Sequence, residues 1–199
     1  MNADRRITFL LPGDNLSGGV RVTTLLANQL LARGYDVRIA VSTHWRELWD
    51  HRTLRPLWSE ARHGWLCDFR GPVQRYRDVN SLTFSAGEVV VGVGTYMIYD
   101  LVRLDAPDVT KVRYHHGFPA NMSAAQRAAW SLPFPTITVS AVHVAELERL
   151  SGQPVRAVIP NGIDLRDYHP EPGVARDAIG TIYAVHPNKA PADIVELLR

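Results

Sequence analysis

Short apolar runs alternate along the chain with longer stretches in which apolar residues recur every three or four positions. The short runs are rich in Val and Ile and are nearly continuous, without a strict alternation of apolar and polar residues. Such runs are typical of strands that are buried on both faces of a parallel sheet. This pattern predicts strands over residues 7–11, 37–41, 89–93, 111–114, 136–139 and 157–159.

Between these strands the periodicity predicts helices over residues 19–32, 96–103 and 142–150. The first helix carries its apolar residues on one stripe that includes Val22, Leu26 and Leu30. Gly34 is expected to end that helix as its C′ residue, and Ser140 is expected to cap the start of the last helix. Repeated β-α-β units of this kind predict an α/β fold with a doubly wound, Rossmann-like parallel sheet flanked by helices.

The end of the chain departs from this organisation. Three prolines within residues 160–172 are typical of an interdomain linker, and a further strand (181–185) and a helix start at Pro191 follow it. One strand and one helix are too little to bury a core. We therefore expect a Rossmann-like domain over residues 1–168, and over 169–199 a linker with the incomplete start of a second domain.

The segment 44–80 combines tryptophans with arginines. Such a segment could lie on an anionic lipid surface, because Trp and Arg both suit the membrane interface. Alternatively it is a solvated loop and helix whose tryptophans pack on the sheet, and the acidic residues interspersed in it favour this second interpretation. Both alternatives remain open. Its tryptophans are Trp45, Trp49, Trp58 and Trp65.

Composition excludes several classes of protein. The chain is 46% hydrophobic and 21% charged, which is typical of globular proteins, and its formal net charge of +2 gives no reason to expect a nucleic-acid partner. Cys67 is the only cysteine, so neither an intrachain disulfide nor a thiolate zinc site can form. Neither a signal-peptide core nor an apolar span of about 20 residues occurs. We expect a cytoplasmic protein, with a peripheral position at the inner membrane face if 44–80 contacts lipid.

A pair of glycines, Gly18 and Gly19, stands between the first strand and the first helix. Backbone amides at a helix N-terminus attract phosphate groups, and glycine lets the backbone approach a ligand closely. The spacing differs from the dinucleotide motif G-x-G-x-x-G, and the second strand ends in Ser42 and Thr43 without an acidic residue for a ribose. From these residues alone, a phosphate site and a simple turn that caps the helix are equally favoured.

A second candidate region is His115-His116-Gly117, at the end of a predicted strand. Ligands of doubly wound sheets bind beyond the carboxyl ends of the strands, so these histidines are expected on the same rim as Gly18 and Gly19. A histidine there could hydrogen-bond a hydroxyl or a phosphate, or it could simply cap the next turn. Because adjacent residues of an extended chain point in opposite directions, at most one is expected to face the cleft. A metal site is not expected, since no carboxylates accompany them.

Four segments resemble the N-terminal half of retaining GT-B glycosyltransferases of the family 4 type. They are the glycine turn with its helix, "SGGVRVTTLLANQLLARGYDV"; the strand end "VRYHHGF"; the helix segment "TITVSAVHVAELERLSG"; and "VIPNGIDLRDYHP", which is similar to the family's interdomain signature. The last is the most specific of the four. The resemblance covers nearly the whole chain and is weakest in the segment 44–80.

The resemblance implies transfer of a sugar, with retention, from a nucleotide-diphosphate sugar to a glycan, lipid or small-molecule acceptor. It implies no cofactor and no obligatory metal. By position, Gly18, Gly19 and Lys189 would contact the donor diphosphate, and His116 would be the catalytic residue. His115, Arg21 and Asp14 would contact the acceptor or the sugar.

Two departures from the family pattern weaken this assignment. Ala184 stands where the family has an arginine, and the family's paired glutamates would lie beyond residue 199. We therefore expect the 199-residue chain to be inactive by itself and to need its missing C-terminal domain or a partner chain. The alternative is a non-catalytic or split-enzyme domain that binds a partner protein or a glycan. Convergence of Gly18, Gly19, His116 and Lys189 on one cleft would favour the enzyme.

Overall fold

The computed structural model describes residues 5–14, 17–44, 64–117 and 123–162, together with 165, 169 and 173. The chain divides into two compact units, Met1–Gly162 and Ile163–Arg199. All described helices and strands belong to the first unit. The strand expected over 181–185 and the helix start expected at Pro191 lie outside the described residues.

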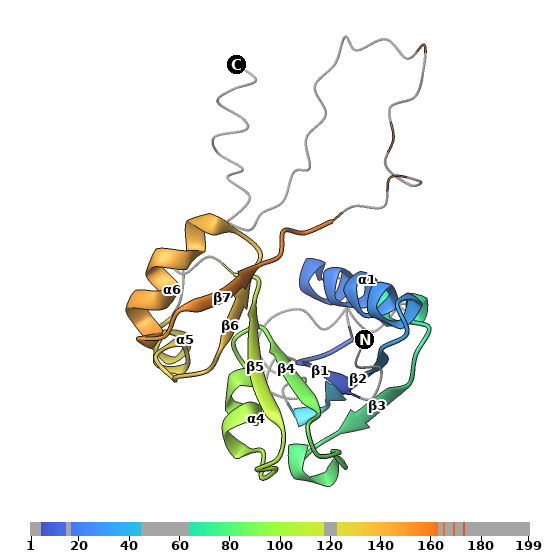
Figure 1. Ribbon diagram of the computed structural model, residues 1–199, viewed down its shortest axis with the longest axis horizontal. Helices are drawn as coiled ribbons and strands as arrows, with labels where there is room; N and C mark the ends of the chain where they lie inside the picture. The colour runs from blue at the N-terminus through green and yellow to red at the C-terminus, as the bar shows by residue number, and fades with distance from the viewer. Residues whose placement is uncertain are drawn as a thin grey trace, which may run out of the picture. The chain divides into compact units, whose positions relative to one another are not determined.

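A parallel seven-stranded sheet forms the centre of the first unit, with the strand order β3-β2-β1-β4-β5-β6-β7 (Figure 1). The protein is thus an α/β protein with a Rossmann-like sheet, as the sequence pattern predicts. The strands are β1 (Arg6–Leu11), β2 (Asp36–Ser42), β3 (Val73–Tyr76), β4 (Val89–Val93), β5 (Thr110–His115), β6 (Thr136–Thr138) and β7 (Val155–Val158).

The six strands predicted from apolar runs are all present, with ends that differ from the prediction by at most two residues. The sequence pattern missed β3, which is an edge strand paired only with β2. Its first three residues are exposed and only Tyr76 is buried. A strand that is solvated along most of its length has no continuous apolar run, so the criterion that found the buried strands could not detect it.

Four α-helices are described, α1 (Gly18–Ala32), α4 (Met97–Arg103), α5 (Ala124–Trp130) and α6 (Val144–Ser151), and three 3₁₀ turns, η1 (Trp65–Asp68), η2 (Val79–Ser81) and η4 (Ala141–His143). Figure 1 shows α1 on one side of the sheet and α4 on the other. Phe9 and Leu11 of β1 pack in the same core cluster as Val20 of α1, whereas Leu10 packs with Met97 of α4. Both faces of the central strand β1 are therefore buried.

Helix ends follow the expected capping rules. Gly34 follows α1 with a φ of 83°, and its amide donates to the Leu31 carbonyl, as expected of a C′ glycine. Ser140 accepts a hydrogen bond from the Val142 amide and so caps η4, which leads into α6. The sequence analysis missed α5, although Ser123 and Gln126 form a capping box there. That S-x-x-Q spacing was the available signal for this short helix.

A buried ion pair ties three strands together near their amino ends. Arg38 of β2 donates from Nη2 to Glu88 Oε1 at 3.2 Å and from Nε to Thr8 Oγ1 at 2.7 Å. Thr8 of β1 in turn donates to Glu88, which directly precedes β4. Glu88 is 1% exposed, so its charge depends on these partners for the solvation that water would otherwise provide.

We expect Glu88→Ala to lower the free energy of unfolding by about 3 kcal/mol or more, because it leaves the Arg38 charge buried and unpaired. The matched control is Asp36→Ala, which breaks the exposed pair between Arg6 and Asp36 and should change stability by less than about 1 kcal/mol. Urea unfolding of both variants measures the difference. Equal losses in the two variants would contradict a structural role for the buried pair.

Candidate functional site

The candidate site is the edge of the sheet at the carboxyl ends of its strands. β1 and β4 are neighbours, with Leu10 level with Gly92, and Val93 is level with Tyr114 of β5. After β1 the chain enters α1 on one face, whereas after β4 it enters α4 on the other. The connections therefore diverge between β1 and β4, and this is the position at which open α/β sheets bind their ligands.

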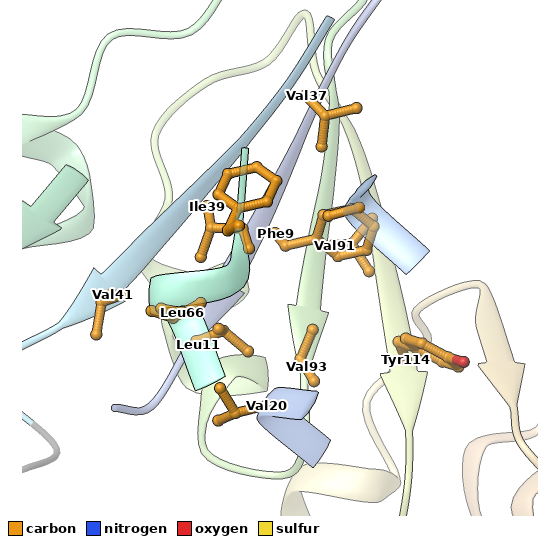
Figure 2. Packing of buried hydrophobic residues seen from close by; sticks show 12 residues of the cluster. Phe9, Leu11, Val20, Val37, Ile39, Val41, Leu66, Val91, Val93 and Tyr114 are labelled. Carbon is orange, nitrogen blue, oxygen red and sulfur yellow. The ribbon is translucent and has the colours of Figure 1, made fainter. Parts of the chain in front are cut away.

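The N-terminus of α1 lies at this edge. Figure 2 shows Val20, in the first turn of α1, beside Leu11 and Val93 at the ends of β1 and β4. Ser17 caps the helix, and its side-chain oxygen accepts a hydrogen bond from the Val20 amide at 3.4 Å. The amides of Gly18 and Gly19 make no hydrogen bond to another described residue, so they remain available to a ligand.

Gly18 and Gly19 are not required by the fold as the structure describes it. Neither has a positive φ, and a Cβ added at either position would meet no atom within 4 Å. Glycine in a helix is less favourable than alanine by up to about 1 kcal/mol. Two glycines in succession thus destabilise the first turn without relieving a clash or a strained conformation in the described structure.

His115 and His116 point to opposite faces of the sheet, as expected for adjacent residues of a strand end. His115 is 1% exposed and its ring packs against Trp130 at 4.0 Å, within the layer that covers β5 and β6. The His116 ring lies 4.1 Å from the ring of Tyr114, and Tyr114 belongs to the same core cluster as Val20 of α1. The structure therefore brings His116, and not His115, to the side of the edge where α1 begins.

Both histidines are held in the neutral state. Burial lowers the pKa of His116 to about 4, and burial together with repulsion from His143 lowers the pKa of His115 to about 3. The ring nitrogens of both residues are shielded from solvent and have no hydrogen-bond partner among the described residues. The Gly117 backbone approaches the His115 ring without reaching hydrogen-bond geometry. A neutral imidazole can accept or donate a hydrogen bond to a hydroxyl group.

Asp14 and Arg21 occupy another part of the same edge, next to η1 and β3. Asp14 pairs with Arg75 at 3.7 Å, and its carboxylate lies so close to Gly64 that a Cβ there would collide with it. The Arg21 guanidinium lies over the Trp65 ring, 4.6 Å from its centroid. The sequence analysis missed Trp65 and Arg75 as neighbours of these residues, because no local signal connects positions so far apart in the chain.

The other sequence-based expectations fall partly outside the described residues. Lys189 lies there, and so does most of the Trp/Arg segment, from 45 to 63. No described helix is long and apolar enough to cross a membrane. The described residues contain no group of three His, Cys, Asp or Glu side chains that could hold a metal ion. An open hollow of about 370 Å³, lined by residues 82–86 and 105–109, lies at the opposite edge, where β4 and β5 begin.

A comparison with models of known protein families finds no match, and a search of curated proteins finds no significantly similar sequence. The fold and the site define the class of protein: a Rossmann-like α/β protein whose candidate ligand site lies at the carboxyl edge of a parallel sheet.

We expect the ring proton signals of His116 to stay constant between about pH 8 and pH 5.5 and to move only near pH 4, because burial keeps the ring neutral. The unfolded chain takes up this proton near pH 6.5, so it binds more protons than the native state below that pH. Stability contributed by this group therefore falls as the pH drops from about 6.5 to 4. An NMR titration, with His116→Gln for assignment, measures the midpoint. A midpoint near 6.5 would show that the ring is solvated.

Proposed function

We propose that this chain is the acceptor-side, Rossmann-like domain of a retaining glycosyltransferase that uses a nucleotide-diphosphate sugar. The observation that carries this proposal is the pair of glycines at the start of α1, whose amides and open surroundings lie at the divergence of β1 and β4. A diphosphate fits this position, because the free amides and the positive end of the helix dipole both favour negative charge.

The glycines favour a ligand over a simple turn for an energetic reason. A turn that only caps the helix would tolerate alanine at both positions, since a Cβ finds open space at each. Glycine is useful there if another molecule must approach the backbone closely. Because four sequence segments resemble family 4 glycosyltransferases, we propose that this molecule is the donor's diphosphate, which Lys189 would contact from the second domain.

His116 is the candidate catalytic residue. It follows β5, two positions along the sheet from β1, and it lies on the face of the sheet that α1 covers. Its neutral ring suits a hydrogen bond to a sugar hydroxyl near the reacting carbon, because a neutral nitrogen can accept or donate. Both ring nitrogens are shielded from solvent, so on this proposal substrate binding must first expose one of them. On this proposal the reaction needs no cofactor and no obligatory metal.

Asp14 and Arg21 are candidates for contacts with the acceptor, a glycan, a lipid or a small molecule. We place the protein in the cytoplasm, and 44–80 is the segment that would contact the inner membrane face. Its Trp65 packs against the core cluster and does not take part in such a contact. A second candidate function is a non-catalytic or split-enzyme domain that binds a partner protein or a glycan. This second candidate is favoured by one observation. Asp14 already pairs with Arg75 and Arg21 already contacts Trp65, so both side chains have structural partners and need no substrate to explain them.

Gly19→Ala should stabilise the domain by up to about 1 kcal/mol, because alanine is the better helix former and its Cβ has open space. The same change should weaken binding of UDP or GDP, since the added methyl group keeps the diphosphate away from the backbone. Urea unfolding measures the first effect, and the shift of the Gly18 amide signal on nucleotide titration measures the second.

The matched control is Gly34→Ala, at the other end of the same helix. Gly34 has a φ of 83°, so alanine should destabilise the domain there by about 1 kcal/mol and leave nucleotide binding unchanged. If Gly19→Ala and wild type gave the same amide shifts with UDP and GDP, Gly18 and Gly19 would be only a helix cap.

His116→Ala should lower turnover by at least about 100-fold with little effect on nucleotide binding, if the histidine acts at the reacting centre. Transfer from nucleotide sugars, assayed with the second domain present, measures the effect. The control is His169→Ala, an exposed residue of the Ile163–Arg199 unit. Unchanged turnover in His116→Ala would assign this histidine a structural role.

A further inference from the structure

Three basic residues are buried together in the layer formed by α5 and α6 over β5 and β6. Arg113 and His115 come from β5 and are 0% and 1% exposed, and His143, at the junction of η4 and α6, is 6% exposed. The Trp130 ring contacts two of them, with the Arg113 guanidinium 4.4 Å from its centroid and the centroid of the His115 ring at 4.0 Å. The rings of His115 and His143 are 5.2 Å apart.

Two of these three residues are hydrogen-bonded. Arg113 donates from Nε and Nη2 to Thr136 Oγ1, at 2.9 and 2.7 Å, and from Nη1 to the Trp130 carbonyl at 3.0 Å. His143 Nδ1 shares a hydrogen bond of 3.2 Å with Thr138 Oγ1. His115, in contrast, has no hydrogen-bond partner on either ring nitrogen among the described residues.

The described charged residues of the surrounding elements do not compensate this cluster. β6 has no charged residue. Arg127 of α5 and Arg149 of α6 both pair with Glu146, away from the core, and Glu148 accepts a hydrogen bond from the Val155 amide.

The polar residues of α4 likewise bind other partners. Asp100 accepts a hydrogen bond from Tyr76, and the Tyr99 hydroxyl donates to the Ala125 carbonyl. None of these interactions brings a described carboxylate to His115, and the charged groups that lower its pKa are all basic: His143, His116 and Arg113.

A proton on His115 would therefore create a buried cation between two other basic groups. Burial and the neighbouring His143 accordingly lower the pKa of His115, and burial lowers that of His143. While the layer stays packed, His115 is not protonated at mildly acidic pH, and burial disfavours a proton on His143. If Trp130 and α6 move away from β5, both rings reach water and can take up a proton near pH 6.5.

Trp130 also contacts the carboxyl edge of the sheet, where the candidate site lies. Its Nε1 donates to Thr95 Oγ1 at 3.2 Å, and Thr95 lies in the turn between β4 and α4 at the carboxyl edge of the sheet. One side chain thus contacts the end of β5, through His115, and the turn after β4, through Thr95.

We propose that the contact of His115 with Trp130 and His143 is an acid-sensitive latch that holds α5 and α6 against the carboxyl edge of the sheet. Acid favours the open layer because only the open layer accepts the protons. When the latch opens, Thr95 loses its hydrogen bond from the Trp130 indole. The end of β5, which leads into His116, is then exposed on the face where His115 packs. The latch operates whether or not the edge binds a nucleotide sugar.

The expected change of the opening constant with pH follows from the proton uptake of the open state. Between about pH 7.5 and pH 5, His115 alone should increase the opening constant of this layer about 30-fold, since its ordinary pKa is near 6.5. His143 should add to this change in the same direction. Hydrogen exchange of the 199-residue chain, corrected for the intrinsic rates at each pH, measures the opening constants of α5 and α6 relative to those of β1 and β2.

His115→Phe and His115→Leu should each reduce the acid-induced increase in the opening constants of α5 and α6 by about 30-fold. Both variants replace the titrating ring with an apolar side chain. His143→Asn should reduce it further while it keeps a polar atom for Thr138. His169→Gln, which removes an exposed histidine, should behave as wild type.

Two results would overturn the latch. The first is an acid-induced increase in the opening constants of the wild type that is equal in β1, β2, α5 and α6. It would mean that the unit opens only as a whole. The second is a wild-type increase that persists in either folded variant of His115. The wild-type comparison needs no substitution, so it decides the matter even if both variants of His115 fail to fold.

Discussion

The parallel sheet must be covered on both faces, and the rest of the structure depends on this constraint. Successive residues of a strand point to opposite sides, so Phe9 and Leu11 require α1 whereas Leu10 requires the layer of α4. Each parallel connection must therefore cross one face or the other. Where the chain changes face, between β1 and β4, the two connections leave the edge in opposite directions. The candidate site is a consequence of covering the sheet.

Two groups of buried charge show different solutions to the same electrostatic problem. Near the amino ends of the strands, Arg38 is paired with Glu88 and further bound by Thr8, so both charges are retained inside the protein. Under α5 and α6, Arg113 keeps its hydrogen bonds to Thr136 and the Trp130 carbonyl, while burial lowers the pKa values of His115 and His143. The first group holds its charges as a hydrogen-bonded pair, whereas the packing of the second disfavours a proton on its histidines.

The edge of the sheet combines rigid support with available polar groups. Val20 anchors the first turn of α1 against Leu11 and Val93 (Figure 2), while the amides of Gly18 and Gly19 make no hydrogen bond to another described residue. His116 is supported by Tyr114 from the same core cluster. The groups that could recognise a ligand are thus carried by the ends of well-packed elements, as precise binding requires.

Local sequence by itself determined the buried strands, α1 and its Gly34 cap, because a buried apolar run and a C′ glycine each express their structure within a few residues. It also determined that His115 and His116 face opposite sides of the sheet, since a strand has a period of two. Only the tertiary structure decided which side each one faces, because this depends on Trp130 and His143, which lie on other elements, and on the core cluster that Tyr114 joins. The solvated edge strand β3 and the pairing of Asp14 with Arg75 were decided in the same way, through contacts between distant residues that local periodicity does not encode.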